Sequence, residues 1–183
     1  MKRLLSIIGA ISLVGTSTTS LVACNKPQQE YTKEELAKLK EENKINTTNQ
    51  QIKNNLEWIA PQEKPFNQVD NKWYYVVWRG NENDNWIISK FKNNIQLEES
   101  KKYNIDKLND NTLDIYYIKG ETNQLLTVYD KKRNLIMPWN NKYENGAYPK
   151  LKNWIKSVYR WNLDTQEPDL IIDNDGNVKV NGE

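Results

Sequence analysis

Short apolar runs, separated by polar turns that contain glycine, dominate the chain from residue 71 onward. The first run, residues 72–79, is apolar on both alternating faces, which is typical of a central strand covered on both sides. The polar residues 80–85 predict a turn, and the same pattern recurs around residues 120–123. The order of these runs favours an antiparallel meander. The expected strands are residues 72–79, 86–91, 113–119, 124–129 and 135–137.

Residues 149–161 have the spacing of an amphipathic helix. Pro149 suits the first helical turn, and apolar residues then recur at i, i+3, i+4, i+7 and i+8, opposite a basic face. A hairpin follows, with strands at 170–172 and 178–180 around an Asp-Gly turn. We therefore expect an α+β fold: an antiparallel meander sheet of about five to seven strands with one packed C-terminal amphipathic helix. The apolar helix positions are Leu151, Trp154, Ile155, Val158 and Tyr159.

A polar, helix-forming segment precedes this domain. Thr32 and Glu35 have the spacing of a capping box, and good helix formers follow them. Further apolar residues recur at helical spacing before Pro61 and could dock a second helix onto the domain. The predicted organisation is a lipidated, helical tether over residues 24–55 and a single extracytoplasmic domain over residues 56–183.

The N-terminal residues have the layout of a secretory signal peptide. Lys2 and Arg3 precede an apolar run over residues 4–14, which is shorter than the ~20 residues that a stable membrane span needs. Residues 1–23 are therefore expected to be removed. An uncleaved transmembrane anchor is the alternative.

The expected signal ends in Leu21, Val22, Ala23 and Cys24. These four residues resemble the lipobox of bacterial lipoproteins, in which the small Ala23 lets the signal peptidase reach the bond before the cysteine. With the Lys- and Asn-rich body behind it, the chain resembles a mollicute lipoprotein of the spiroplasma type. The resemblance implies that Cys24, the only cysteine, carries at least two acyl chains and holds the protein to the lipid bilayer on the outer face of the plasma membrane.

The net charge of +2 resides in the signal segment. Lys2 and Arg3 lie there with no acidic residue, so 24 of the 26 basic residues remain beside all 24 acidic ones. A domain that is neutral as a whole lacks the overall basic charge that binds polyanions. The local basic residues Lys131, Lys132 and Arg133 could form a patch, but a solvated turn is favoured there. No nucleic-acid partner is expected.

The chain has no histidine, and its one cysteine is expected to be acylated. The mature domain therefore cannot build a Ser-His-Asp or Cys-His catalytic set, or a zinc site with imidazole or thiolate ligands. No nucleotide-binding Gly-rich loop is present, so neither a cofactor nor a metal is expected. Residues 173–176 resemble part of a calcium loop, but Ile171 stands five residues before Gly176, where a ligand is needed, which favours a simple turn.

Aromatic residues, 7 Trp and 10 Tyr, are the main candidates for function. Aromatics at alternating positions are usually core residues, but one helix covers only one face of such a sheet, and an uncovered aromatic face would mark a partner surface. We expect a non-enzymatic surface lipoprotein that binds or displays, with a protein or glycan of the host or of the same cell as partner. The candidate face consists of Trp73, Tyr75, Trp86, Tyr116, Tyr117 and Trp139.

Two alternatives stay open: an enzyme that uses carboxylates alone, such as a glycosidase, and a carbohydrate-binding module. A glycosidase needs two carboxylates across a cleft, and Trp and Tyr rings can stack on sugars. The 24 acidic residues allow many such pairs and specify none. A transporter's binding subunit is disfavoured, because two lobes around a cleft need a longer chain.

Overall fold

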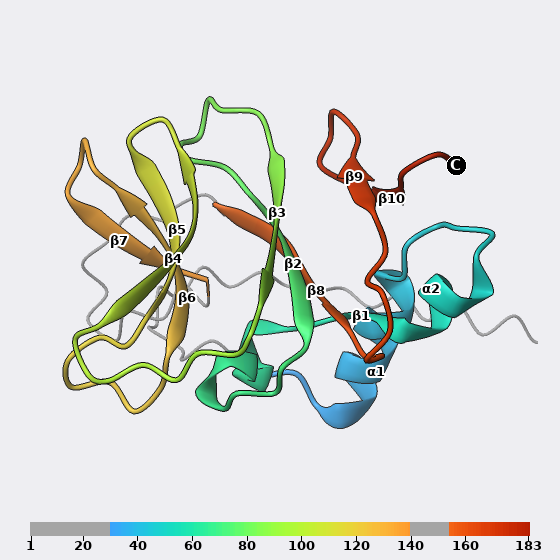
Figure 1. Cartoon of the computed structure of the whole chain (residues 1–183), viewed down its shortest axis with the longest axis horizontal. Helices are drawn as coiled ribbons and strands as arrows, with labels where there is room; N and C mark the ends of the chain where they lie inside the picture. The colour runs from blue at the N-terminus through green and yellow to red at the C-terminus, as the bar shows by residue number, and fades with distance from the viewer. Residues whose placement is uncertain (1–29, 140–153) are drawn as a thin grey trace, which may run out of the picture.

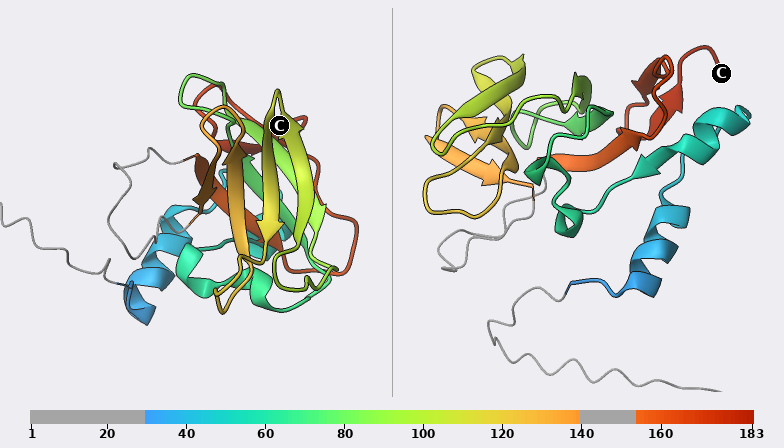
Figure 2. Two further views of the ribbon diagram at one scale, coloured as in Figure 1. Left: turned by 90° about the vertical axis from the view of Figure 1, so that its left-hand side faces the viewer. Right: turned by 60° about the horizontal axis from the view of Figure 1, so that its bottom comes forward.

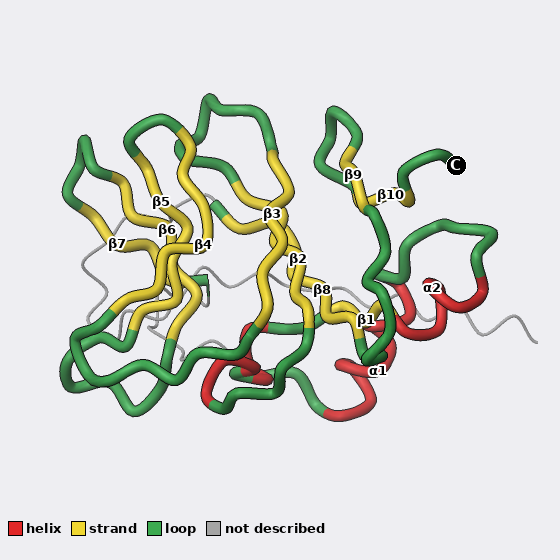
Figure 3. Tube along the Cα trace, viewed as in Figure 1, coloured by secondary structure: helices red, strands yellow, loops and turns green. Residues whose placement is uncertain are grey.

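The computed structural model describes residues 30–139 and 154–183. In this part of the chain, ten strands form three antiparallel sheets (Figures 1 and 3). The first sheet has the order β1 (Leu56–Trp58), β8 (Ile155–Trp161), β2 (Trp73–Trp78), β3 (Ile87–Lys92). The second sheet has the order β4 (Lys102–Leu108), β5 (Asn111–Tyr116), β6 (Leu125–Asp130), β7 (Leu135–Pro138). The third is a hairpin of β9 (Leu170–Ile172) and β10 (Val178–Val180), called the C-terminal hairpin below.

The first and second sheets pack face to face around the main core. Side chains alternate along β2, so that Tyr74, Val76 and Trp78 point toward the second sheet. In the left view of Figure 2 the second sheet lies in front of the first, in the manner of a sandwich. The residues that meet β2 in this core include Leu113, Ile115, Leu126, Val128 and Met137 of the second sheet.

The opposite face of the first sheet has a core of its own. Tyr75, Val77 and Trp161 point to this side and are buried. They are covered by the N-terminal helical segment and by the C-terminal hairpin. The covering residues are Ile45, Ile52, Leu170 and Val178.

Short helices occur only near the N-terminal end of the described residues. The capping box expected at Thr32 is confirmed: its hydroxyl accepts from the Glu35 N–H at 3.2 Å, and its own N–H donates to the Glu35 carboxylate at 2.8 Å. No helix in the described ranges is long and apolar enough to cross a membrane. The expected signal peptide and Cys24 lie outside the described residues. The helices are α1 (Lys33–Glu42), α2 (Gln50–Asn55) and the 3₁₀ turns η1 (Pro61–Glu63) and η2 (Pro65–Asn67).

The α+β prediction is wrong, because the described fold is mostly β and has no C-terminal amphipathic helix. Residues 149–153 lie outside the described part, and residues 155–161 form β8 inside the first sheet, between β1 and β2. The predicted single meander is instead divided between two packed sheets and the C-terminal hairpin.

A β-bulge explains why this strand has helical spacing. The pairing of β2 with β8 shifts at one point, so that Trp78 pairs with Ile155 whereas Val76 pairs with Val158. Ile155 and Val158, three residues apart, therefore both face the main core. Because β8 is a central strand, its other face, with Tyr159 and Trp161, is apolar as well. Together, the apolar residues of the two faces recur at a spacing that resembles that of an amphipathic helix.

The other expected strands are confirmed to within about two residues at most ends. They correspond to β2, β3, β5, β6, β7, β9 and β10. Two strands, β1 and β4, were not predicted. The second helix expected before Pro61 ends at Asn55, and Leu56–Trp58 form β1 instead. The exposed positions of β4 carry Lys and Asn, and its apolar alternation is weak.

Candidate functional site

Three of the six candidate aromatic residues lie on the outer face of the first sheet, which the C-terminal hairpin partly covers. Trp73, Tyr75 and Trp86 all belong to the core on the outer face of the first sheet. Tyr75 is only 2% exposed, and its hydroxyl donates to the carbonyl of Pro168. A Cβ placed on Gly176, in the hairpin turn, would lie 2.8 Å from Trp86 Cγ, so this turn sits directly on the indole ring. The hairpin thus covers part of the face that we expected to be free.

The other three lie elsewhere. Trp139 packs against the main core, with its ring centroid 6.4 Å from that of Phe66. Tyr116 ends β5 in the second sheet, Tyr117 follows it, and both are partly buried. The six residues therefore do not form one continuous exposed patch.

A groove of about 620 Å³ opens between the N-terminal segment and the C-terminal hairpin, and its volume is in the range of ligand-binding pockets. One wall is the stretch 42–48, which joins α1 to α2. The other wall is the hairpin turn with β10, residues 176–180, and Ser157 and Tyr159 of β8 lie between the walls. In Figure 1 the walls are the red hairpin and the blue-to-cyan segment on the right.

The first wall is an extended stretch that is anchored at alternate positions. Ile45 and Thr47 are buried, whereas the residues between and after them are exposed. The Tyr159 hydroxyl donates to the Asn43 carbonyl at 3.1 Å. Burial raises the pKa of Tyr159, although a hydrogen bond with Ser157 acts in the opposite direction, so the hydroxyl remains a donor.

The second wall begins with the turn that was weighed as a calcium loop. Asp173 accepts hydrogen bonds from the N–H groups of Asp175 at 3.0 Å and Asn177 at 2.9 Å, and the bond from Asn177 lowers the pKa of Asp173. Lys156 Nζ donates to the Asp175 carbonyl. Among the described residues, no three His, Cys, Asp or Glu side chains gather as metal ligands, and the turn closes by its own hydrogen bonds.

Charges balance along the groove. Lys179 pairs with Asp173 at 3.5 Å, and the Glu183 carboxylate accepts from the Thr48 hydroxyl at 3.1 Å. The remaining lining is rich in amide and hydroxyl groups. The groove therefore suits an uncharged ligand with its own donors and acceptors. Its charged lining residues are Glu42, Lys44, Lys156, Asp173, Lys179 and Glu183.

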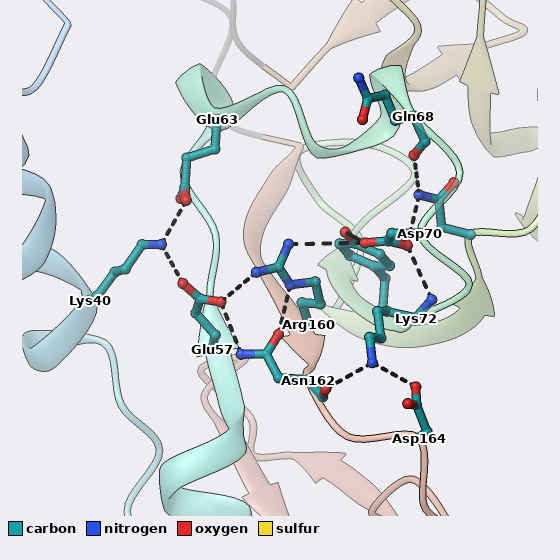
Figure 4. A network of polar contacts seen from close by, with 11 residues as sticks. Lys40, Glu57, Glu63, Gln68, Asp70, Lys72, Arg160, Asn162 and Asp164 are labelled. Carbon is teal, nitrogen blue, oxygen red and sulfur yellow. Dashed lines mark hydrogen bonds and ion pairs between the residues drawn. The ribbon is translucent and has the colours of Figure 1, made fainter.

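A second polar cluster, drawn in Figure 4, holds α1 against the first sheet. Lys40 Nζ donates to Glu57 of β1 and, at 2.6 Å, to Glu63 of η1. Arg160 of β8 donates to the second carboxylate oxygen of Glu57 at 2.7 Å. These side chains are only partly exposed, and their contacts link one helix, one 3₁₀ turn and two strands. The cluster therefore fixes α1 in place.

This cluster gives little support to an enzyme that uses carboxylates alone. Burial alone would raise the pKa of Glu57, but hydrogen bonds from Lys40 and Asn162 and the charges of Lys40 and Arg160 outweigh it, and the pKa is lowered. A glycosidase needs one carboxylic acid with a raised pKa as proton donor. Glu57 does not fit that role.

Neither the groove nor this cluster is apparent from the sequence. Both are assembled from segments far apart in the chain, such as residues 42–48 and 173–183 for the groove. The one local signal was the predicted hairpin at 170–180, which forms a wall.

Comparison with known proteins finds no family model, no curated protein and no solved structure that matches the chain. The described residues define a two-sheet antiparallel sandwich whose outer face is covered by docked helices and a hairpin, with an open groove between these two covers.

Proposed function

We propose that the protein is a lipid-anchored surface protein that binds a partner without transforming it, and that the groove beside β10 is its binding site. The main support for this proposal is the groove, which has a volume of about 620 Å³, balanced charges and a lining of amides and hydroxyls. Such a surface favours an uncharged, hydrogen-bonding segment or glycan, from the host or from the same cell.

The N-terminal end of the described fold supports a short anchor. The Gln62 side chain accepts from the Tyr31 N–H at 2.9 Å and donates to the Tyr31 carbonyl at 3.0 Å, so the domain holds the chain from Tyr31 onward. The stretch from Cys24 to Tyr31 can reach at most about 25 Å. With Cys24 acylated, as the lipobox implies, the domain would stand next to the outer face of the plasma membrane.

The test is a binding screen of the full chain, reconstituted in lipid vesicles, against an array of unstructured peptides and an array of glycans. We expect wild-type protein to retain probes and Ser157→Trp, which fills the groove between its walls, to weaken retention at least about tenfold. Cys24→Ser should bind the same probes but no longer remain with the vesicles.

Lys107→Trp is the matched control, because it adds the same side chain at an exposed position of β4 on the second sheet. Its binding should equal that of wild type. The proposal is contradicted if the wild-type protein retains no probe, or if Ser157→Trp, shown by circular dichroism to be folded, binds as well as Lys107→Trp does.

A further inference from the structure

Strand β10 has one edge without a partner strand. Within the described ranges it pairs only with β9 (Figure 1). Two hydrogen bonds set the pattern of that pairing: the Asp173 N–H donates to the Asn177 carbonyl, and the Asn181 N–H donates to the Asp169 carbonyl, each at 3.0 Å. In antiparallel strands, hydrogen-bonded pairs alternate with pairs whose groups point outward.

This alternation identifies the outward groups of β10. Lys179 lies midway between the two bonded pairs and so bonds to β9, whereas Val178 and Val180 direct their N–H and C=O groups away from it. The Val180 carbonyl accepts a long bond from Glu183 at 3.4 Å. Three groups thus remain on the open edge: both backbone groups of Val178 and the N–H of Val180.

The open edge faces the groove. The groove is lined by Val178, Lys179 and Val180, but not by β9. Successive residues of a strand point to opposite faces, so a wall that includes three in a row contacts the strand along its edge. The unpaired backbone groups therefore border the groove.

The lining favours a peptide over a sugar. Tyr159 is the one aromatic lining residue among those described, and it is only 6% exposed, with its hydroxyl bonded to Asn43. A sugar ring would find no free aromatic face there. A peptide backbone, in contrast, offers donors and acceptors at the spacing of a strand edge.

We propose that the groove binds an extended, uncharged peptide segment of a partner protein, which adds to the C-terminal hairpin as a third strand beside β10. This inference rests on the proposed function and names its ligand class. Main-chain hydrogen bonds to Val178 and Val180 supply affinity, and the side chains along residues 42–48 and β8 select the sequence.

The test uses octapeptides composed of Thr, Ser, Val and Gln and the full chain in vesicles. In the best binder, each amide is N-methylated in turn. Because a paired strand directs alternate amides to its neighbour, methylation should weaken binding about tenfold or more at every second position and little at the others. Equal effects at neighbouring positions would overturn strand addition.

A protein variant provides the second arm. Val178→Pro removes an outward N–H and leaves the bonds to β9 in place, so it should weaken binding about tenfold. Ile172→Pro removes the corresponding outward N–H on the opposite edge of the hairpin, outside the groove lining, and should bind as wild type does. The methylation scan does not depend on the folding of either variant.

The remaining outcomes separate the two proposals. If only glycans bind and Ser157→Trp prevents it, strand addition fails and the proposed function stands. If peptides bind with the alternating pattern but Ser157→Trp has no effect, the groove is not the site and both fail. Dimers of the full chain that Val178→Pro dissociates would show that a second copy, and not a partner peptide, occupies the edge.

Discussion

Trp78→Ala should lower the free energy of unfolding by about 3–5 kcal/mol, the usual cost of truncating a buried tryptophan. Trp78 is fully buried between the two sheets. Its indole N–H donates to the Ser89 hydroxyl at 2.7 Å, and Ser89 in turn donates to Asp106 of β4, so one polar chain links the first sheet to the second. Urea denaturation followed by circular dichroism measures the loss.

Trp78→Phe separates packing from hydrogen bonding. It keeps most of the buried ring but removes the N–H, so a loss of about 1–2 kcal/mol is expected. A loss below about 1 kcal/mol for Trp78→Ala would mean that the side chain is not enclosed by two sheets.

Gly176→Ala should lower the free energy of unfolding by about 2–5 kcal/mol, from two sources. Gly176 has φ of +77°, a conformation that strains an alanine by about 1–2 kcal/mol. The new Cβ would also lie 2.8 Å from Trp86 Cγ, and the indole is held by the Arg79 guanidinium 4.5 Å from its centroid. Overpacking of this kind adds about 1–3 kcal/mol.

Gly120→Ala is the matched control. Gly120 also has a positive φ, +85°, but a Cβ there meets nothing within 4 Å. It should therefore show only the backbone strain, and the difference between the two variants in urea denaturation measures the contact of the hairpin with Trp86. Equal losses would show that the hairpin does not rest on this ring.

Hairpin strands could be predicted because their signals are local. The runs that became β2 and β3, and the turn between β9 and β10, each combine β-prone residues with turn residues inside a short window. The strand at 155–161 could not be recognised, because a bulge places Ile155 and Val158 on one face at helical spacing. Pairing with β2, some eighty positions away, makes residues 155–161 a strand, and the local sequence gives no sign of that pairing.

The site was harder to predict than the fold. Trp73, Tyr75 and Trp86 were expected to be exposed because only one helix was predicted to cover the sheet. In the structure, the hairpin and residues 45–52 cover their face. Whether an aromatic residue in a strand is core or surface depends on the layer above it, and that layer comes from the chain ends. The open edge of β10 depends in the same way on which strands meet.

Residue-resolved amide hydrogen exchange on the full chain tests the central position of β8 and the open edge of β10 together. The amides of β8 should exchange as slowly as those of β2, and within β10 the Lys179 amide should be protected while those of Val178 and Val180 exchange fast. Fast exchange throughout residues 155–161, or equal protection of Val178 and Lys179, would contradict this arrangement of strands and the binding edge that follows from it.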